Sequence, residues 1–451
     1  MSFRRKLCVA AAIAGLVLPA MAQAETLQDA LIAAYQGNPQ LGAQRDQAGA
    51  AQEQLAQARA QWRPRVTLSG SYGYERIETN RPFAANVGER SIATAQLQTV
   101  MPVYAGGRIN AGIEQARAGI GAANAELRGT VQELMLQTVT AYVDVRRDLE
   151  AVDIRLRSVE LLEEQFRASE DRFDVGVVTR TDVALTQARL EGGRAALAAA
   201  QAQLQGSIAV YQFLTGNEPD ILLAPPPVPI LPTSFEDALV IALSDNPELE
   251  ASRFAERAAE AGVTGAYGAL KPTVSIVGTA SAQETYLNDY RETQVSATAR
   301  VSVPLFEGGL TQSQVRSAKL ERERTRSQTD NRERQVQAQL SQAWYSYIAS
   351  QSSILASERQ VDAATIAFEG AKEELSVGVR TTVDVLDQEQ QLYEARLNLV
   401  RSQRDAYVAA HELLRAMGLL TPRTLGLDIE EYDPDDYGDR IRRNWLLTDI
   451  D

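Results

Sequence analysis

Histidine and cysteine, two residue types that often carry catalytic and metal chemistry, are nearly absent from this chain. Among 451 residues it has one histidine, His411, and one cysteine, Cys8. No second imidazole or thiolate exists to share a metal ion with His411 or to build a nucleophilic triad around it. We therefore interpret His411 as a packing or surface residue. We predict that the chain is not an enzyme and needs no metal and no cofactor.

A glycine-rich stretch raises the possibility of phosphate binding. Ala105-Gly106-Gly107-Arg108 could form a nest of backbone amides, but it lacks the spacing of a P-loop. The stretch recurs as Glu307-Gly308-Gly309-Leu310, where the basic residue is missing. A bend between a strand and a helix explains both copies, so we predict a structural role for them.

Carboxylates remain as candidate functional groups. The formal net charge of −14 argues against nucleic-acid binding, and most acidic side chains are expected on solvated helix faces. Asp384 and Asp387 differ because they lie three residues apart, on one face of a predicted helix. Asp384 could instead cap that helix or interact with its dipole. Asp387 lies too deep in the helix to cap it.

These two carboxylates belong to a phrase that the chain repeats. Residues 377–387 read VGVRTTVDVLD, and residues 175–185 read VGVVTRTDVAL. Glycine allows each chain reversal, and the Thr and Asp residues that follow supply N-caps for a returning helix. Asp182 matches Asp384, but Leu185 stands where the second copy has Asp387. This asymmetry favours the second copy as the functional one.

The repetition extends over most of the chain. Matching markers lie 208 residues apart as far as Pro64 and Pro272, and 202 apart from Pro102 and Pro304 onwards. Constant spacing is expected of long packed helices, which fix the register. The predicted division is a signal peptide at 1–24, repeat one at 25–216, a proline-rich linker at 217–233, repeat two at 234–418 and an acidic tail at 419–451.

The predicted signal peptide has a basic start, a short apolar core and the motif Ala22-Gln23-Ala24, so we expect cleavage before Glu25. Cleavage would also remove Cys8. No later apolar stretch reaches the length of a membrane-spanning helix, so we expect an exported chain without a helical anchor. The acidic tail is expected either to pack with the linker around the middle of the helices or to stay partly disordered.

Each repeat is predicted to hold a pair of strands. Apolar and small polar residues alternate from Val66 to Tyr74 and, after the polar loop Glu78 to Ser91, from Ile92 to Pro102. Val295 to Val303 repeats the pattern. Such strands suit either a water-filled transmembrane barrel or a sheet packed on a soluble core. Four strands cannot close a barrel, so several chains would have to share one.

The strand pairs are flanked by helices. Leu27 to Trp62 has a helical composition that is interrupted at Asn38-Pro39. Arg108 to Val175 and Leu310 to Val377 each form a proline-free run of 68 residues, about 100 Å of helix. Helices are predicted to return over Thr181 to Leu214 and Thr382 to Met417. Helices of this length must lie side by side in a bundle or a tube.

The chain resembles the TolC family of outer-membrane efflux and type I secretion channels over nearly its whole mature length. The resemblance rests on Arg172-Phe173-Asp174-Val175-Gly176 with Thr181-Asp182-Val183, on Ser376-Val377-Gly378 with Arg380-Thr381 and Val383-Asp384-Val385-Leu386-Asp387, and on the Asn-Pro pairs and the prolines before each Gly-Gly. The implied fold is an α+β membrane protein: a homotrimer in which four strands per protomer build one 12-stranded β-barrel, continuous with a long periplasmic α-helical barrel.

The resemblance also implies a function and partners. The protein would be a passive exit duct in the outer membrane of a Gram-negative cell, reaching into the periplasm. It would dock through a periplasmic adaptor (membrane fusion protein) onto an inner-membrane ABC or RND-type transporter, and its cargo would be proteins or small molecules. A soluble periplasmic coiled-coil scaffold or adaptor is the alternative. An adaptor should show one compact β-domain between its helices, whereas this chain repeats its whole strand-and-helix unit.

Individual residues match positions that control the closed tip in the family. Asp384 and Asp387 match a ring of carboxylates, which threefold symmetry would turn into six around a constriction. Such a ring would attract cations and raise the pKa values of its members. Arg380 matches a linking arginine with Thr181 and Asp182 as acceptors, although it could be a solvated surface residue. A second link is in doubt because Leu375 replaces its tyrosine. The turns that would contact the adaptor are Val175, Gly176, Val177, Val377, Gly378 and Val379.

Overall fold

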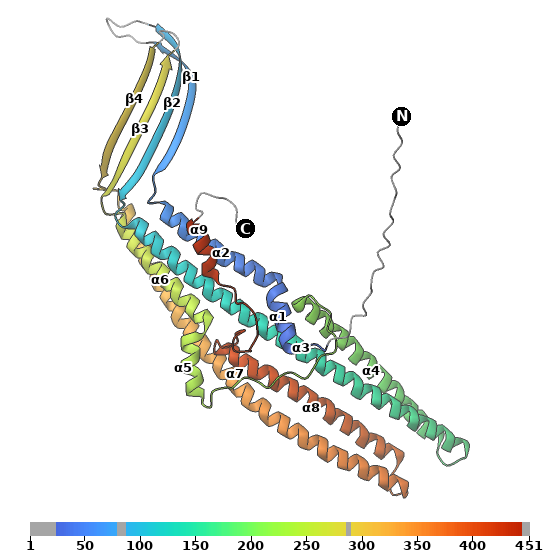
Figure 1. Ribbon diagram of the computed structural model, residues 1–451. Coiled ribbons are helices and arrows are strands. Elements are labelled where there is room, and N and C mark those ends of the chain that lie inside the picture. Colours follow the sequence, from blue (N-terminus) through green and yellow to red (C-terminus); the bar gives the residue numbers. More distant parts are fainter. Residues whose placement is uncertain (1–23, 79–86, 286–289, 444–451) are drawn as a thin grey trace, which may run out of the picture.

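The computed structural model describes residues 24–78, 87–285 and 290–443. The predicted signal peptide, apart from Ala24, lies outside these ranges, as do residues 79–86 of the predicted polar loop. Over the described ranges, a curved sheet stands at one end of a long body of helices (Figure 1).

The sheet contains four antiparallel strands in chain order. They are β1 (Arg65–Glu78), β2 (Val87–Tyr104), β3 (Thr273–Thr285) and β4 (Tyr290–Ser302). The two repeats meet where β2 pairs with β3, and the register shifts between Pro102 and Tyr104. The predicted strand pairs are confirmed, but β2 begins earlier and ends later than the alternation indicated. Pairing with neighbours on both sides extends this strand beyond the segment with a clear apolar period.

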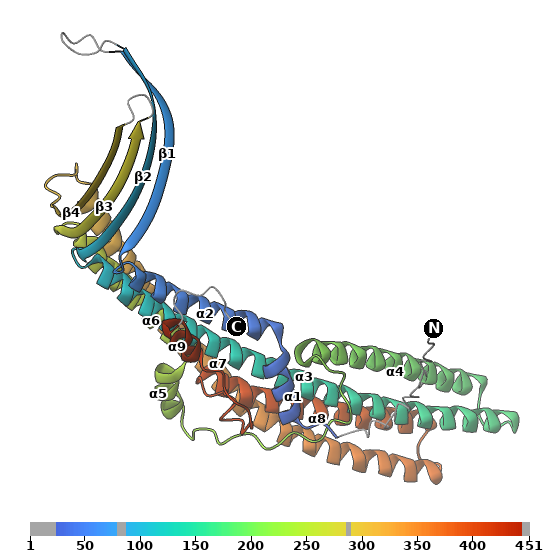
Figure 2. The ribbon, with the colours of Figure 1, turned by 45° about the horizontal axis from the view of Figure 1, so that its top comes forward.

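The sheet has no helical cover in either view (Figures 1 and 2). Large apolar side chains such as Val66, Tyr72 and Leu68 therefore stay exposed, the last to 77%. A soluble domain would bury such a face against a second layer, because each apolar side chain gains about 1.5–3 kcal/mol on burial. This arrangement argues against the prediction of a sheet packed on a soluble core.

The short helices begin and end at the Asn-Pro pairs. Asn38 ends α1 (Leu27–Gly37) and caps α2 (Pro39–Ala60), and its amide also donates to the backbone oxygen of Leu214 at 3.2 Å. Asn246 plays the same part between α5 (Phe235–Asp245) and α6 (Pro247–Gly268), donating to Ala416 at 3.1 Å. Each pair thus joins the start of a repeat to the end of its returning helix.

Four long helices form the body. They are α3 (Arg108–Asp174), α4 (Arg180–Thr215), α7 (Leu310–Ser376) and α8 (Thr382–Ala416). The predicted 68-residue helices are 67 residues long, and each packs against its returning partner. The strand-to-helix bend before α3 needs glycine, because Gly106 has φ +66° and a Cβ there would lie 2.2 Å from the backbone oxygen of Gly268. No described helix is long and apolar enough to cross a membrane.

The core lies around the middle of the helices. Tyr142 on α3 is fully buried and donates to the linker oxygen of Leu223 at 2.8 Å. Tyr407 on α8 donates to Pro226 at 3.1 Å, so the proline-rich linker packs across both repeats. His411 is buried here, and burial lowers its pKa. His411 is therefore a packing residue, in agreement with its interpretation from the sequence.

The described part of the acidic tail includes a helix on the outside of the body. Helix α9 (Pro434–Arg443) packs against α2 (Figure 2). The Tyr437 hydroxyl donates to Glu53 at 3.1 Å, and the Gln52 amide donates to Asp435 at 3.1 Å. As far as residue 443 the tail is packed, but α9 contacts α2 rather than the proline-rich linker named in the packed alternative.

Candidate functional site

The two helix reversals lie together at the end of the molecule opposite the sheet (Figure 1). At the first, Gly176 adopts φ +76° and its N–H donates to Phe173 at 2.9 Å, while Val177 donates to Arg172 at 2.9 Å. These two bonds form a Schellman motif, which satisfies the last carbonyl groups of α3. The second tip repeats both bonds around Gly378, so the doubled phrase encodes two copies of one turn.

Both returning helices begin with a capping box. Thr179 caps α4, and its backbone N–H donates to Asp182 Oδ2 at 2.8 Å; Thr381 caps α8, and its N–H donates to Asp384 Oδ2 at 3.0 Å. Backbone and side-chain hydrogen bonds from Thr179 lower the pKa of Asp182. The Thr381 hydroxyl, its backbone N–H and, less strongly, the charge of Arg380 lower the pKa of Asp384.

Asp384 therefore has the capping role that its position allowed. The cap residue itself is the threonine, and the aspartate completes the box from the third helical position. Within one protomer the pKa of Asp384 moves down, opposite to the rise expected from a ring of like charges. The ring is a property of the assembled trimer and stays a prediction.

Asp387 lies one turn further along α8 and contacts repeat one. Its Oδ1 accepts a hydrogen bond from Nη2 of Arg189 on α4 at 2.7 Å, and Nη1 of the same guanidinium donates to Gln390 Oε1 at 2.6 Å. The second predicted ring carboxylate is thus held by an arginine that the sequence analysis missed. Residues 189 and 387 lie 198 positions apart in the chain, and no short sequence motif predicts that they are in contact.

Arg380 has a different partner from the predicted one in this protomer. Its Nε donates to Glu374 Oε2 at 2.6 Å, across the turn of its own hairpin. Arg380 and Asp182 nevertheless line the same cleft of about 250 Å³ between the two tips, together with Leu375. The described residues include no hydrogen bond from Arg380 to Thr181 or Asp182, so that link stays a prediction.

The turns carry an apolar surface that nothing in the protomer covers. Val175 and Val177 at the first tip and Val377 and Val379 at the second are between 72% and 74% exposed. Exposed apolar side chains that gather at one site commonly mark a contact for another protein.

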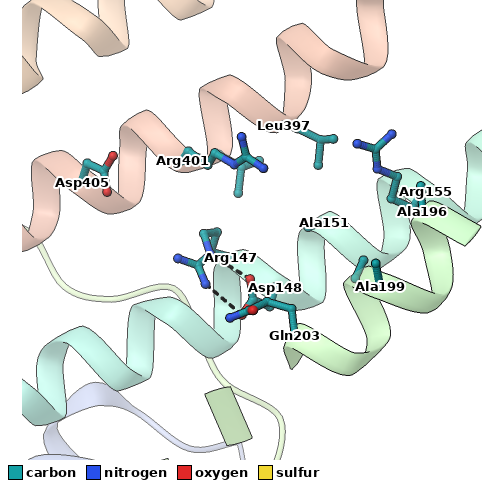
Figure 3. A pocket seen from close by; sticks show the side chains of 12 residues that line it. Arg147, Asp148, Ala151, Arg155, Ala196, Ala199, Gln203, Leu397, Arg401 and Asp405 are labelled. Carbon is teal, nitrogen blue, oxygen red and sulfur yellow. Dashed lines mark hydrogen bonds and ion pairs between the residues drawn. The ribbon is translucent and has the colours of Figure 1, made fainter. Parts of the chain in front are cut away.

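A larger cleft of about 610 Å³ lies between α3, α4 and α8, further from the tips (Figure 3). Arg147 turns to Asp148, with 2.8 Å between Nε and Oδ1, and small residues such as Ala196 and Ala199 form part of the wall. Asp148 is further held by Ser207. Over the described part of the chain, no group of three or more His, Cys, Asp and Glu side chains could hold a metal ion.

Comparison with known proteins identifies this architecture. The sequence profile described as outer membrane efflux protein matches residues 30–217 and 238–419. The chain belongs to the outer membrane efflux protein family. It is 32% identical over 445 residues to the outer membrane efflux protein BepC of Brucella suis biovar 1 (strain 1330), with 97% of this chain and 96% of that protein covered.

A second relative and a solved structure also resemble this efflux protein. The outer membrane protein TolC of Escherichia coli (strain K12) is 26% identical over 421 residues, covering 90% of this chain and 84% of TolC. The crystal structure of the outer membrane protein VceC from Vibrio cholerae has the same fold, with a TM-score of 0.76 at 22% identity over 87% of this chain and 96% of that one.

Membership of the family confirms the resemblance found in the sequence. The efflux protein is an outer-membrane exit duct rather than a soluble scaffold, and it reaches into the periplasm. Its four strands belong to a barrel shared by a trimer, and it works with a periplasmic adaptor and an inner-membrane transporter. The family is one of channels rather than enzymes.

Proposed function

We propose that the paired hairpin tips of this efflux protein form the periplasmic gate of the duct. Asp384 and Asp387 would line its constriction as a ring of carboxylates. Arg380 would hold neighbouring hairpins closed through Thr181 and Asp182. The exposed valines of both turns would contact the adaptor. The duct itself would conduct passively, with protein or small-molecule cargo supplied by the transporter.

One observation carries this proposal: the residues in question converge. Two hairpins that begin some 200 positions apart in the chain end at the same place. There Arg380 and Asp182 share one cleft, and Asp387 contacts α4. The bond of Arg380 to Glu374 is an exposed ion pair, a kind worth about 0–1 kcal/mol, so exchange of that bond for one to another hairpin would cost little.

Single-channel conductance in a planar bilayer tests the gate. The wild-type trimer should show a small, cation-selective conductance, and Asp384→Ala/Asp387→Ala should reduce that selectivity because it removes the negative potential of the constriction. Glu358→Ala/Asp362→Ala removes two exposed carboxylates from α7, far from the tip, and serves as the control. It should behave like the wild type. A channel with unchanged selectivity after the Asp384 and Asp387 substitutions would remove the ring and keep the duct.

A further inference from the structure

An ion pair joins the two repeats beside the proposed gate. Arg189 Nη2 lies 2.7 Å from Asp387 Oδ1, and Arg189 Nη1 lies 2.6 Å from Gln390 Oε1. The guanidinium of Arg189 on α4 thus bridges two side chains that lie about one turn apart on α8. The Gln390 amide nitrogen in turn donates to Glu394 at 2.9 Å, which fixes which end of the amide faces Arg189.

The pair exists because the two repeats differ at complementary positions. At the repeat spacing of 202, Asp387 corresponds to Leu185, and Arg189 corresponds to Gln391. One repeat has the carboxylate and the other the guanidinium, and each has an uncharged residue at the position that corresponds to the charged one. Asp387 alone would add a negative charge to this part of α8, whereas the pair with Arg189 adds no net charge.

The two carboxylates of the proposed constriction are therefore in different electrostatic states. Asp384 is bound by the neutral hydroxyl and N–H groups of Thr381, and Arg380, the cation that acts on it, is paired with Glu374 instead. Asp387 faces a guanidinium within hydrogen-bond distance, so its charge is balanced on site. The side chains of Arg189 and Asp387 are 37% and 47% exposed, so water and ions reach the pair.

We propose that Arg189 is a specificity-determining residue of the duct, which neutralises Asp387 and thereby limits how strongly the periplasmic constriction favours cations. This inference rests on the proposed gate. In the trimer three guanidinium groups would offset three of the six carboxylates. The remaining selectivity would come mainly from Asp384.

Reversal potentials across a planar bilayer with a KCl gradient test this role. Arg189→Gln leaves Asp387 unbalanced and should raise the ratio of cation to anion permeability. A unit charge about 8 Å from a permeating ion in water changes its population about twofold, and three copies act together, so the expected rise is at least about twofold. Arg189→Lys keeps the charge and should stay near the wild-type ratio.

Two further variants separate the possible outcomes. Asp387→Asn leaves Arg189 unbalanced and should lower the ratio by about twofold or more. Adding Arg189→Gln to Asp387→Asn removes both charges and should return the ratio to near the wild-type value, because the two side chains form one neutral pair. Arg194→Gln is the matched control: this α4 arginine lies further from the tip and pairs with Glu163 and Glu191 inside the first hairpin, so its loss should change the ratio much less than Arg189→Gln does.

The result that overturns the inference is an unchanged ratio in Arg189→Gln. If Asp384→Ala/Asp387→Ala still loses selectivity in the same assay, the gate stands and only the role of Arg189 fails. If no substitution at Asp384, Asp387 or Arg189 alters the ratio, the proposed gate fails together with this inference.

Discussion

Glu389 shows how strongly a single position on a helix decides the state of a carboxyl group. It lies two residues beyond Asp387, but its side chain turns into the packed body and is only 3% exposed. Its Oε1 has no hydrogen-bond partner among the described residues. Burial raises the pKa of Glu389 to about 7, and a hydrogen bond with Tyr393 opposes that rise only partly.

Because the pKa of Glu389 is raised, we expect the stability of the protein to depend on pH. Its folded-state pKa lies above the ordinary value of 4.5, so the folded chain holds the proton more tightly than the unfolded chain. The stabilisation is complete below about pH 4.5 and is lost as the pH rises through about 7. The loss amounts to at most about 3 kcal/mol per protomer. We expect thermal unfolding in detergent to show a smaller fall in stability from pH 5 to pH 8 for Glu389→Gln than for the wild type.

Other carboxyl groups titrate in both proteins, so the difference between the two pH profiles isolates Glu389. Asp182 and Asp384 work in the opposite direction, because hydrogen bonds in their capping boxes lower their pKa values. Parallel profiles for the wild type and Glu389→Gln would show that Glu389 is not buried in the assembled protein.

At the scale of elements, each tip is a rigid turn that presents apolar side chains. The Schellman motif and the capping box together satisfy the backbone groups at the ends of both helices. The valines of the two turns are not needed to satisfy these backbone groups, and their side chains remain exposed. Their role is therefore separable from folding.

Charged substitutions at the tips should disconnect the duct from its adaptor. We expect Val177→Asp/Val379→Asp to abolish cross-linking to the adaptor and export by cells, because each carboxylate would have to be desolvated in an apolar contact. Conductance of the purified channel should be retained. Val240→Asp, at an exposed position on α5 away from the tips, is the control. Normal export by the tip variant would place the adaptor contact elsewhere.

The elements could be predicted from sequence because local physics determines them. Period-two alternation indicated strands, long proline-free runs indicated helices, and a single glycine in each repeat, Gly176 or Gly378, indicated the reversals, all of which the structure contains. The expected end of the first helix near Trp62 was two residues late, since α2 ends at Ala60, and β2 proved longer than its apolar alternation. Such ends depend on neighbouring strands and loops rather than on propensity.

Contacts between the two hairpins could not be predicted in the same way. Arg189 and Asp387 are 198 residues apart, so their meeting depends on how two hairpins align after folding. Arg380 turned to Glu374 in its own hairpin, a partner that no motif indicated. The burial of Glu389 likewise follows from the packing of α8 rather than from its polar sequence context.

At the scale of the whole molecule, the protein belongs to a tube with a membrane barrel at one end and the proposed gate at the other. The sheet leaves its apolar side chains without cover, and the helices reach about 100 Å away from it before they reverse. Both features require an assembly larger than one chain. Movement of the hairpin tips would then open or close the far end while the barrel stays fixed.

The most direct test of this account is to lock the tips. Residues 25–451 contain no cysteine, so Asp182→Cys/Arg380→Cys adds the only two thiols and allows a verified cross-link between hairpins. On a denaturing gel, links between protomers would give dimers and trimers. We predict a large single-channel conductance in the reduced variant, because the proposed link is gone, and a small one after cross-linking. A verified cross-link that leaves the conductance unchanged would contradict a gate at the hairpin tips.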